Sequence, residues 1–266
     1  MTTAQAVRQV FAFFGFLGRR TGKTRVFAIL GLIPVALAVV VRIFLHGRAG
    51  LMADVSTEIL MVFFLQFYIV ILALFYGTSV TAEEVENRTL CYLITRPIPK
   101  PAIVLGKFTA YTALMFAMVS LSLTLSYFII NAVRLGDPAI YGTFLRYLGV
   151  LGLGILAYTA FFTFLGTILK RAIIVGLVFG FGWENVIQYF PGSTQKFSIV
   201  HYLKSLLPYH PPVVGGGGGG RGVALLLFRL EPTKPLVAVL ALAVIMAALL
   251  ALACWAFRMK EYLYEE

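Results

Sequence analysis

The sequence predicts an all-α integral membrane protein with six transmembrane helices. Of its 266 residues, 60% are hydrophobic and only 12% are charged, whereas a soluble domain has about 45–50% apolar and about 25% charged residues. The apolar residues form continuous runs, without the alternation of a membrane β-barrel. Six runs approach or exceed the roughly 20 residues that a spanning helix needs: Val26–Leu45, Ile59–Val80, Phe108–Asn131, Thr143–Leu169, Ala172–Phe190 and Pro235–Phe257.

Positive charge in the short loops predicts the orientation of these spans. Lys and Arg collect in the N-terminal segment, after the second and fourth spans, and after the last span. Cytoplasmic loops carry such an excess, so we expect both termini in the cytoplasm and a multi-pass protein of the inner membrane. The net charge of +11 then favours membrane lipids as partners, and no nucleic acid is expected. We expect residues 1–266 to form a single transmembrane permease domain.

The N-terminal segment 1–25 combines aromatic residues with the basic sequence GRRTGKTR. This composition predicts an amphipathic helix in the cytoplasmic membrane interface, and a disordered basic tail is the alternative. Gly18–Thr24 is one residue shorter than a phosphate-binding loop, which needs four residues between its glycines. We therefore expect no nucleotide site here.

The cytoplasmic segment 81–107, between the second and third spans, predicts a short amphipathic helix. Acidic residues come first and basic residues last, an order that suits the helix dipole. Leu90, Leu93 and Ile94 recur at i, i+3 and i+4, so one face is apolar, and the prolines of Arg96–Pro101 then predict an extended chain. The apolar face packs either on a partner or on the protein's own helices. The pattern leaves both open.

The sequence EEVENRTLCYLITRPIPKPAIVLGK, Glu83–Lys107, resembles the first cytoplasmic loop of the type-2 ATP-binding-cassette (ABC) export permeases. The shared order is an acidic pair, Arg-Thr-Leu, a Leu/Ile pair, Thr-Arg-Pro and an aliphatic run ending in Gly-Lys. Arg88 replaces the glycine that is usual in the family. The six-span layout, the basic N-terminal segment and the long outer segment 191–234 extend the resemblance over nearly the whole chain.

The resemblance implies the transmembrane permease subunit of an exporter, not an enzyme in itself. Two separate ATPase subunits would bind ATP and Mg, and this chain would hold no cofactor. A second permease copy is expected, identical because oligomers are usually symmetric, with a different permease chain as the alternative. The coupling helix would lie within Glu84–Arg96 and meet the ATPase through Glu83, Glu84, Glu86, Arg88, Thr89, Leu90, Leu93, Ile94 and Arg96.

A membrane protease of the CAAX type is a rival interpretation. Glu83–Arg88 matches its first motif, Glu-Glu-x-x-x-Arg, and Phe197–His201 supplies Phe-x-x-x-His. Glu83 or Glu84 would then act with His201, but about 30 Å of hydrocarbon is expected between them, and catalytic partners need hydrogen-bond reach. The later His-x-x-x-Asp/Asn motif is also missing, so this interpretation is not favoured.

A non-ABC carrier or channel is a third alternative, because such proteins carry ionisable residues inside their spans. Glu184, with Asn185 and Gln188 nearby in the fifth span, is the clearest case here. An acid at that depth costs several kcal/mol unless it is paired, neutral or hydrated. Glu184 is therefore a pathway or gating residue, a structural partner of a neighbouring helix, or a residue at the outer interface.

The outer segment 191–234 has two different halves. Phe197, Val200, Leu203, Leu206 and Leu207 recur at helical spacing, which predicts a short amphipathic helix at the outer surface. The run Gly215–Gly220 is either a flexible hinge or a tolerated surface expansion. The two cysteines, Cys91 and Cys254, predict neither a disulfide nor a metal site, and the substrate and any periplasmic partner are left open.

Overall fold

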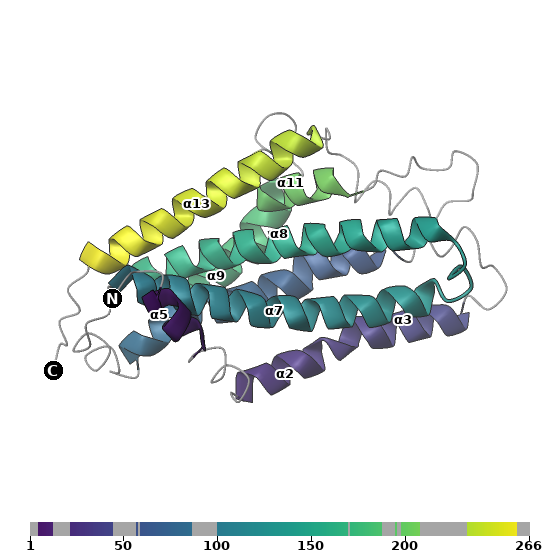
Figure 1. Cartoon of the computed structure of the whole chain (residues 1–266), viewed down its shortest axis with the longest axis horizontal. Coiled ribbons are helices and arrows are strands. Elements are labelled where there is room, and N and C mark those ends of the chain that lie inside the picture. Colours follow the sequence, from purple (N-terminus) through teal and green to yellow (C-terminus); the bar gives the residue numbers. More distant parts are fainter. Residues whose placement is uncertain are drawn as a thin grey trace.

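The computed structural model describes residues 5–12, 22–44, 57, 59–86, 100–169, 171–187, 195, 198–207 and 233–259. Within these residues every regular element is a helix, and most of the long helices run along the long axis of the molecule (Figure 1). The elements are α2 (Gly22–Leu30), α3 (Leu32–Phe44), η1 (Phe64–Tyr68), α5 (Ile69–Glu86), α7 (Lys100–Ile130), α8 (Pro138–Ile168), α9 (Ala172–Leu177), η2 (Val178–Trp183), α10 (Glu184–Ile187), α11 (Ile199–Leu206) and α13 (Pro235–Met259).

Five helices in the described part of the chain are long and apolar enough to cross a membrane. They are Thr24–Ile43, Ile59–Val80, Pro101–Ile130, Pro138–Ile168 and Pro235–Met259. The predicted span Ala172–Phe190 appears as the shorter apolar helix Ala172–Trp183, which α10 continues to Ile187. The all-helical membrane architecture is therefore confirmed. The fifth predicted span is helical as far as Ile187, and its last three residues lie outside the described part of the chain.

Two helices extend into the segment 81–107 that the sequence assigns to a cytoplasmic loop. α7 begins at Lys100 instead of Phe108, so Pro101 lies in its first turn. Proline fits there because its missing N–H is not needed by the helix, and the extended chain predicted at Pro101 is wrong. α5 continues to Glu86, so Glu83, Glu84 and Glu86 end a spanning helix; they do not begin a separate one.

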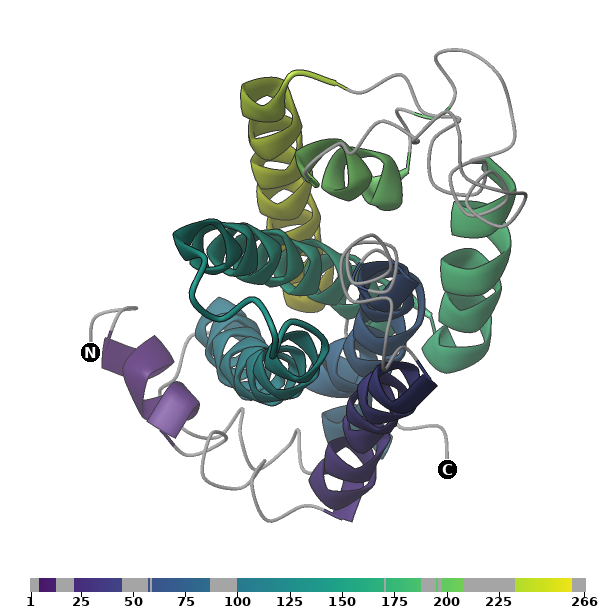
Figure 2. The same ribbon diagram turned by 90° about the vertical axis from the view of Figure 1, so that its right-hand side faces the viewer.

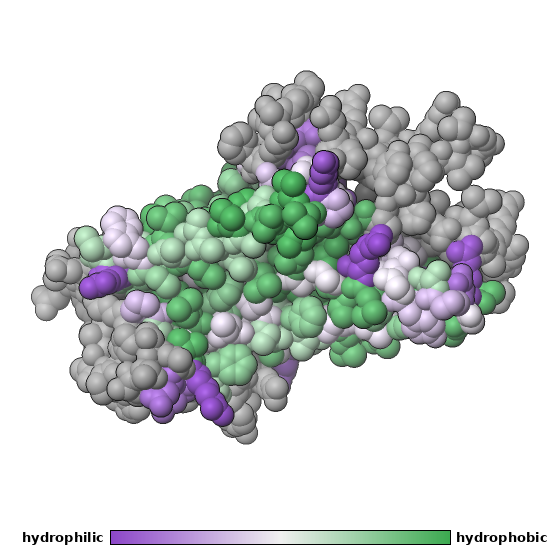
Figure 3. Space-filling model, turned by 45° about the horizontal axis from the view of Figure 1, so that its top comes forward, coloured by the Kyte–Doolittle hydropathy of each residue, from purple (hydrophilic) through white to green (hydrophobic). Residues whose placement is uncertain are grey.

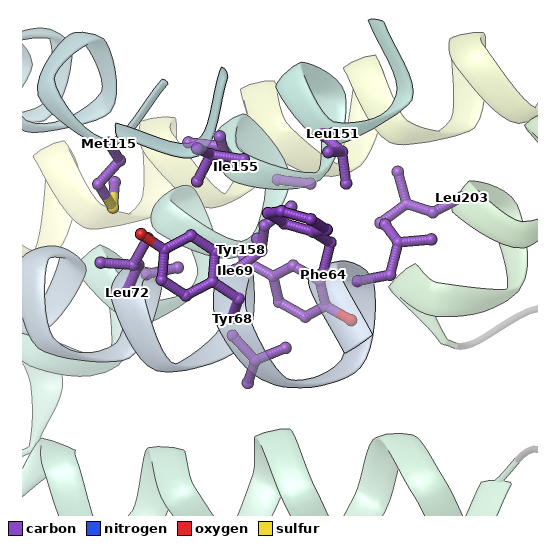
Figure 4. Packing of buried hydrophobic residues seen from close by; sticks show 14 of the residues in the cluster. Phe64, Tyr68, Ile69, Leu72, Met115, Leu151, Ile155, Tyr158 and Leu203 are labelled. Carbon is purple, nitrogen blue, oxygen red and sulfur yellow. The ribbon is translucent and has the colours of Figure 1, made fainter. Parts of the chain in front are cut away.

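The second and fourth predicted spans form the centre of the bundle. Within their most apolar windows, 61% of Ile59–Val80 and 56% of Pro138–Ile168 is buried, against 17% of Pro235–Met259. Figure 4 shows Phe64 and Tyr68 of η1 packed near Leu151, Ile155 and Tyr158 of α8. The peripheral helices expose mainly aliphatic side chains, and the green flank in Figure 3 shows this apolar surface. Such a surface is suited to lipid.

Close helix packing in this core depends on two glycines. A Cβ at Gly77 of α5 would lie 2.8 Å from Phe162 Cβ of α8, and one at Gly176 of α9 would overlap Leu74 Cδ1 of α5. Small residues let helix backbones approach in membranes, where packing contributes most of the association energy. α9 and α8 are thereby packed directly onto α5.

The N-terminal residues 5–12 are helical and pack on the start of α7. Ala6 is fully buried and Val10 is 5% exposed, and Val10 lies where a side chain at Gly106 would project. The alternative of a disordered tail is therefore wrong for these residues.

Candidate functional site

The two ends of the helix bundle are called the turn end and the terminal end below. The turn end carries residues 131–137, which join α7 to α8, and the terminal end is where α7 begins and α13 ends (Figure 1). The short helix α11 lies between them, beside α8 and α13, as the view from the turn end also shows (Figure 2).

The apolar face of α11 is buried against the middle of α8. Val200 is 1% exposed and Leu203 is fully buried, and a Cβ at Gly154 of α8 would lie 3.2 Å from Leu203 Cδ1. Gly154 is about 24 Å along the helix axis from Pro138. The predicted amphipathic helix is therefore present as Ile199–Leu206, and it packs on the middle of α8, where Gly154 leaves room for Leu203.

The carboxylate of Glu184 caps the first turn of α11. Its Oε1 accepts a hydrogen bond from the Ile199 N–H at 3.2 Å, and its Oε2 accepts one from the Val200 N–H at 3.3 Å. The Ser198 hydroxyl donates a short hydrogen bond to the same Oε2 and accepts one from the His201 N–H at 3.4 Å. Two side chains thus satisfy the first three N–H groups of the helix.

This arrangement explains why an acidic residue can be buried at the end of an apolar helix. Glu184 is only 2% exposed and Ser198 is 1% exposed, so water is a poor substitute partner for the helix start. The first N–H groups of any helix lack partners within it, and leaving them unpaired among apolar groups costs free energy. Negative charge is also favoured at a helix N-terminus.

A second polar contact joins α11 to the chain that leads into α13. His201 Nε2 and Thr233 Oγ1 are 3.0 Å apart and hydrogen-bonded, and the Thr233 N–H donates to Ser205 Oγ at 3.3 Å. Thr233 precedes α13, which starts at Pro235. One short helix is therefore attached both to α10, through Glu184, and to the start of α13.

Lys204 adds a cationic group to this polar cluster. Its side chain is 9% exposed, and burial lowers the pKa of Lys204 to about 8, although the charge of nearby Glu184 acts in the opposite sense. No group of three or more His, Cys, Asp or Glu residues in the described part of the chain could hold a metal ion. The cluster is suited to hold a helix in place.

The structure places the acidic residues Glu83, Glu84 and Glu86 and the residue His201, which the protease interpretation would bring together, in different elements. Glu83, Glu84 and Glu86 end α5, while the segment 88–96 with the rest of the expected ATPase contacts lies outside the described residues. The helix α11, which carries His201, contacts η1, and α5 extends about 21 Å from Ile69, the residue after η1, to Glu83. His201 belongs to the α11 cluster and contacts Thr233. This distance disfavours a protease site shared by the two.

The role of Glu184 is resolved only in part by the sequence. In the structure Glu184 is a structural partner of a neighbouring helix, which is one of the three alternatives that the sequence left open. The backbones of Glu184 and Asn185 both belong to α10. Gln188 lies outside the described residues. Ser198 and Thr233 were missed; a serine before an apolar helical run is an N-cap signal, but no local pattern marks Thr233.

The comparisons with known proteins identify the family. Residues 21–262 match the model of the family described as ABC-2 family transporter protein, and the comparison with curated proteins gave no match. The matched region includes every described helix from α2 to α13 as well as the sequence Glu83–Lys107. The chain therefore belongs to the ABC-2 transporter family, as its sequence resemblance indicated, and is a multi-pass membrane permease of an ABC transporter.

Proposed function

We propose that the chain is the permease subunit of an ATP-driven exporter, working as two identical copies with two ATPase subunits that bind ATP and Mg. The observation that carries the proposal is the family match over residues 21–262. In this arrangement the ATPase supplies the free energy, and the permease transmits movement through its helices. The substrate class is left open.

The position of the segment between α5 and α7 supports coupling through it. α5 runs without a break to Glu86, and α7 starts at Lys100. α5 lies in the most buried span of the described structure and packs against α7, α8 and α9. A force applied to the segment 87–99 would therefore reach the centre of the bundle directly.

Charge supports assigning the terminal end to the cytoplasm and the turn end to the outside. Arg25 lies at the start of the first span, Thr24–Ile43, and Arg258 lies in the last turn of α13. Arg96 precedes α7 in the sequence, and Lys100 is the first residue of α7. An excess of Lys and Arg is typical of cytoplasmic loops. The segment 87–99 would then face the ATPase.

Replacing one apolar residue of the proposed coupling helix tests this function. Leu93→Asp is expected to lower recovery of the co-expressed ATPase by about tenfold or more, since loss of a buried interface side chain can cost over 2 kcal/mol. Arg96→Ala should have a smaller effect, because rim charges contribute less. Recovery is measured by affinity purification of the tagged permease from membranes.

Leu135→Asp is the matched control, because Leu135 is 43% exposed in the turn at the opposite end. It should leave ATPase recovery unchanged. Full recovery with Leu93→Asp, or equal losses with both variants, would show that the segment 87–99 is not the coupling element.

A further inference from the structure

We propose that α11 is a latched outer lid of the permease, and that outward opening requires its release from Glu184 and Thr233. We call these two attachments, made through Glu184, Ser198, His201 and Thr233, the α11 latch. The proposal rests on the proposed function, which supplies the outer side and the ATP-driven movement. Glu184 and Thr233 are positioning residues in it.

The α11 latch joins two elements that are far apart in sequence. Glu184 belongs to α10, at the end of the apolar helix from Ala172, and Thr233 leads into α13. Each holds α11 by hydrogen bonds near its first turn or along its polar side. α10 and the start of α13 therefore cannot separate unless α11 is released from one of them.

The face of α11 that packs on α8 is apolar. Val200 and Leu203 are buried, and Leu203 lies over Gly154. A contact between such surfaces holds the helix without fixing its direction, because the hydrophobic effect is not directional. The bonds from Glu184 supply the direction and register.

Burial gives the latch two distinct states. In the closed state the carboxylate and the first N–H groups of α11 satisfy one another away from water. A partial displacement would leave both unpaired in an apolar environment, which is costly. The helix is therefore either docked with its bonds intact or released far enough for water to replace them, as in other bistable elements.

A buried reporter on α11 can distinguish the two states. Val200→Cys, placed in a chain with Cys91→Ser and Cys254→Ala, puts a thiol where the native side chain is 1% exposed. The permease, with its co-purified ATPase in lipid nanodiscs, is treated with a membrane-impermeant maleimide. The reporter should label slowly in the resting complex.

Weakening either attachment should expose the reporter. Glu184→Gln keeps one acceptor oxygen but loses the charge, and Thr233→Val removes the hydroxyl that contacts His201. Each should raise the labelling rate by roughly tenfold, the factor that corresponds to losing one hydrogen bond of this kind. Asp137→Asn, which alters a carboxylate cap elsewhere, should leave the rate unchanged.

A second reporter, Gly136→Cys, tests whether the reagent reaches an exposed thiol equally in all variants. Gly136 has nothing within 4 Å of where its Cβ would be, so its labelling should be the same in every background. Unchanged labelling of Val200→Cys in both Glu184→Gln and Thr233→Val would overturn the latch.

Trapping the ATPase with ATP and vanadate tests whether the latch opens during transport. Labelling of Val200→Cys in the otherwise unaltered latch should rise by roughly tenfold, as it does when one attachment is removed. If it stays at the resting rate in the trapped complex, although the same preparation hydrolyses ATP without vanadate, α11 is a fixed structural element and the lid is disproved. If no ATPase co-purifies, the proposed function fails, whereas the resting comparison of latch variants still tests the attachments.

Discussion

Two helices of this protein begin at a carboxylate, but in different surroundings. α8 is capped by Asp137, whose Oδ1 accepts from the Ala139 N–H at 3.0 Å in an exposed turn. α11 is capped by Glu184, which is buried and comes from another element of the chain. The first cap is local in sequence and open to solvent, and the second is neither.

The difference shows that the same chemistry serves two purposes. Water can replace an exposed cap, so Asp137 adjusts the stability of a helix that its apolar span already favours. α11 is eight residues long, too short to be stable alone, and its first N–H groups are buried. Glu184 therefore determines whether and where α11 docks.

Among the substitutions that test this comparison, Glu184→Ala should lower the stability of the protein most. It removes the acceptor of two backbone N–H groups and of the Ser198 hydroxyl, so we expect a loss of about 3 kcal/mol or more in the stability of the detergent-solubilised protein. The melting temperature, followed by fluorescence-detected size-exclusion chromatography after heating, provides the measurement. Glu184→Gln should lie between this variant and the parent. A melting temperature equal to that of the parent would mean that α11 docks without its cap.

The sequence predicted most of the framework because apolar runs are a local signal. Ile59–Val80 is recovered with the predicted bounds, and Pro235–Met259 differs from its prediction only at the end. Two helices start earlier than predicted, each at or next to a proline: α7 accepts Pro101 in its first turn, and α8 starts at Pro138 instead of Thr143, with Asp137 as its cap. In both cases proline occupies a position that needs no N–H.

The candidate site was less accessible to sequence analysis, because its bonds are not local. Glu184 was identified as costly at its depth, but its partners Ile199 and Val200 follow only after a further segment of chain. The position of α11 along α8 depends on Gly154, and a glycine in an apolar helix does not indicate which side chain will lie over it. Pairing across elements is a property of the tertiary structure.

Gly154→Leu should have the next largest effect, because it removes the space that α11 occupies. Leu203 Cδ1 would lie 3.2 Å from the new Cβ, and Ile69 Cδ1 would be 3.7 Å away, so the longer side chain must displace α11. Overpacking of this kind costs about 1–3 kcal/mol. Gly142→Leu on the same helix is the control, because nothing lies within 4 Å of its Cβ position. Equal melting temperatures for the two variants would mean that α11 is not held against α8.

Asp137→Asn should change the stability least, and it tests the exposed cap of α8. Asparagine caps helices about as well as aspartate, so the substitution should change stability by only a few tenths of a kcal/mol, and Asp137→Ala by about 1 kcal/mol. The reason is solvent: the Ala139 N–H is exposed at the turn, so water takes the place of the lost oxygen. The same melting measurement applies, with Glu184→Ala run in parallel. If Asp137→Ala lowered the melting temperature as much as Glu184→Ala does, burial would not be what separates the two caps, and the special role given to Glu184 would have to be withdrawn.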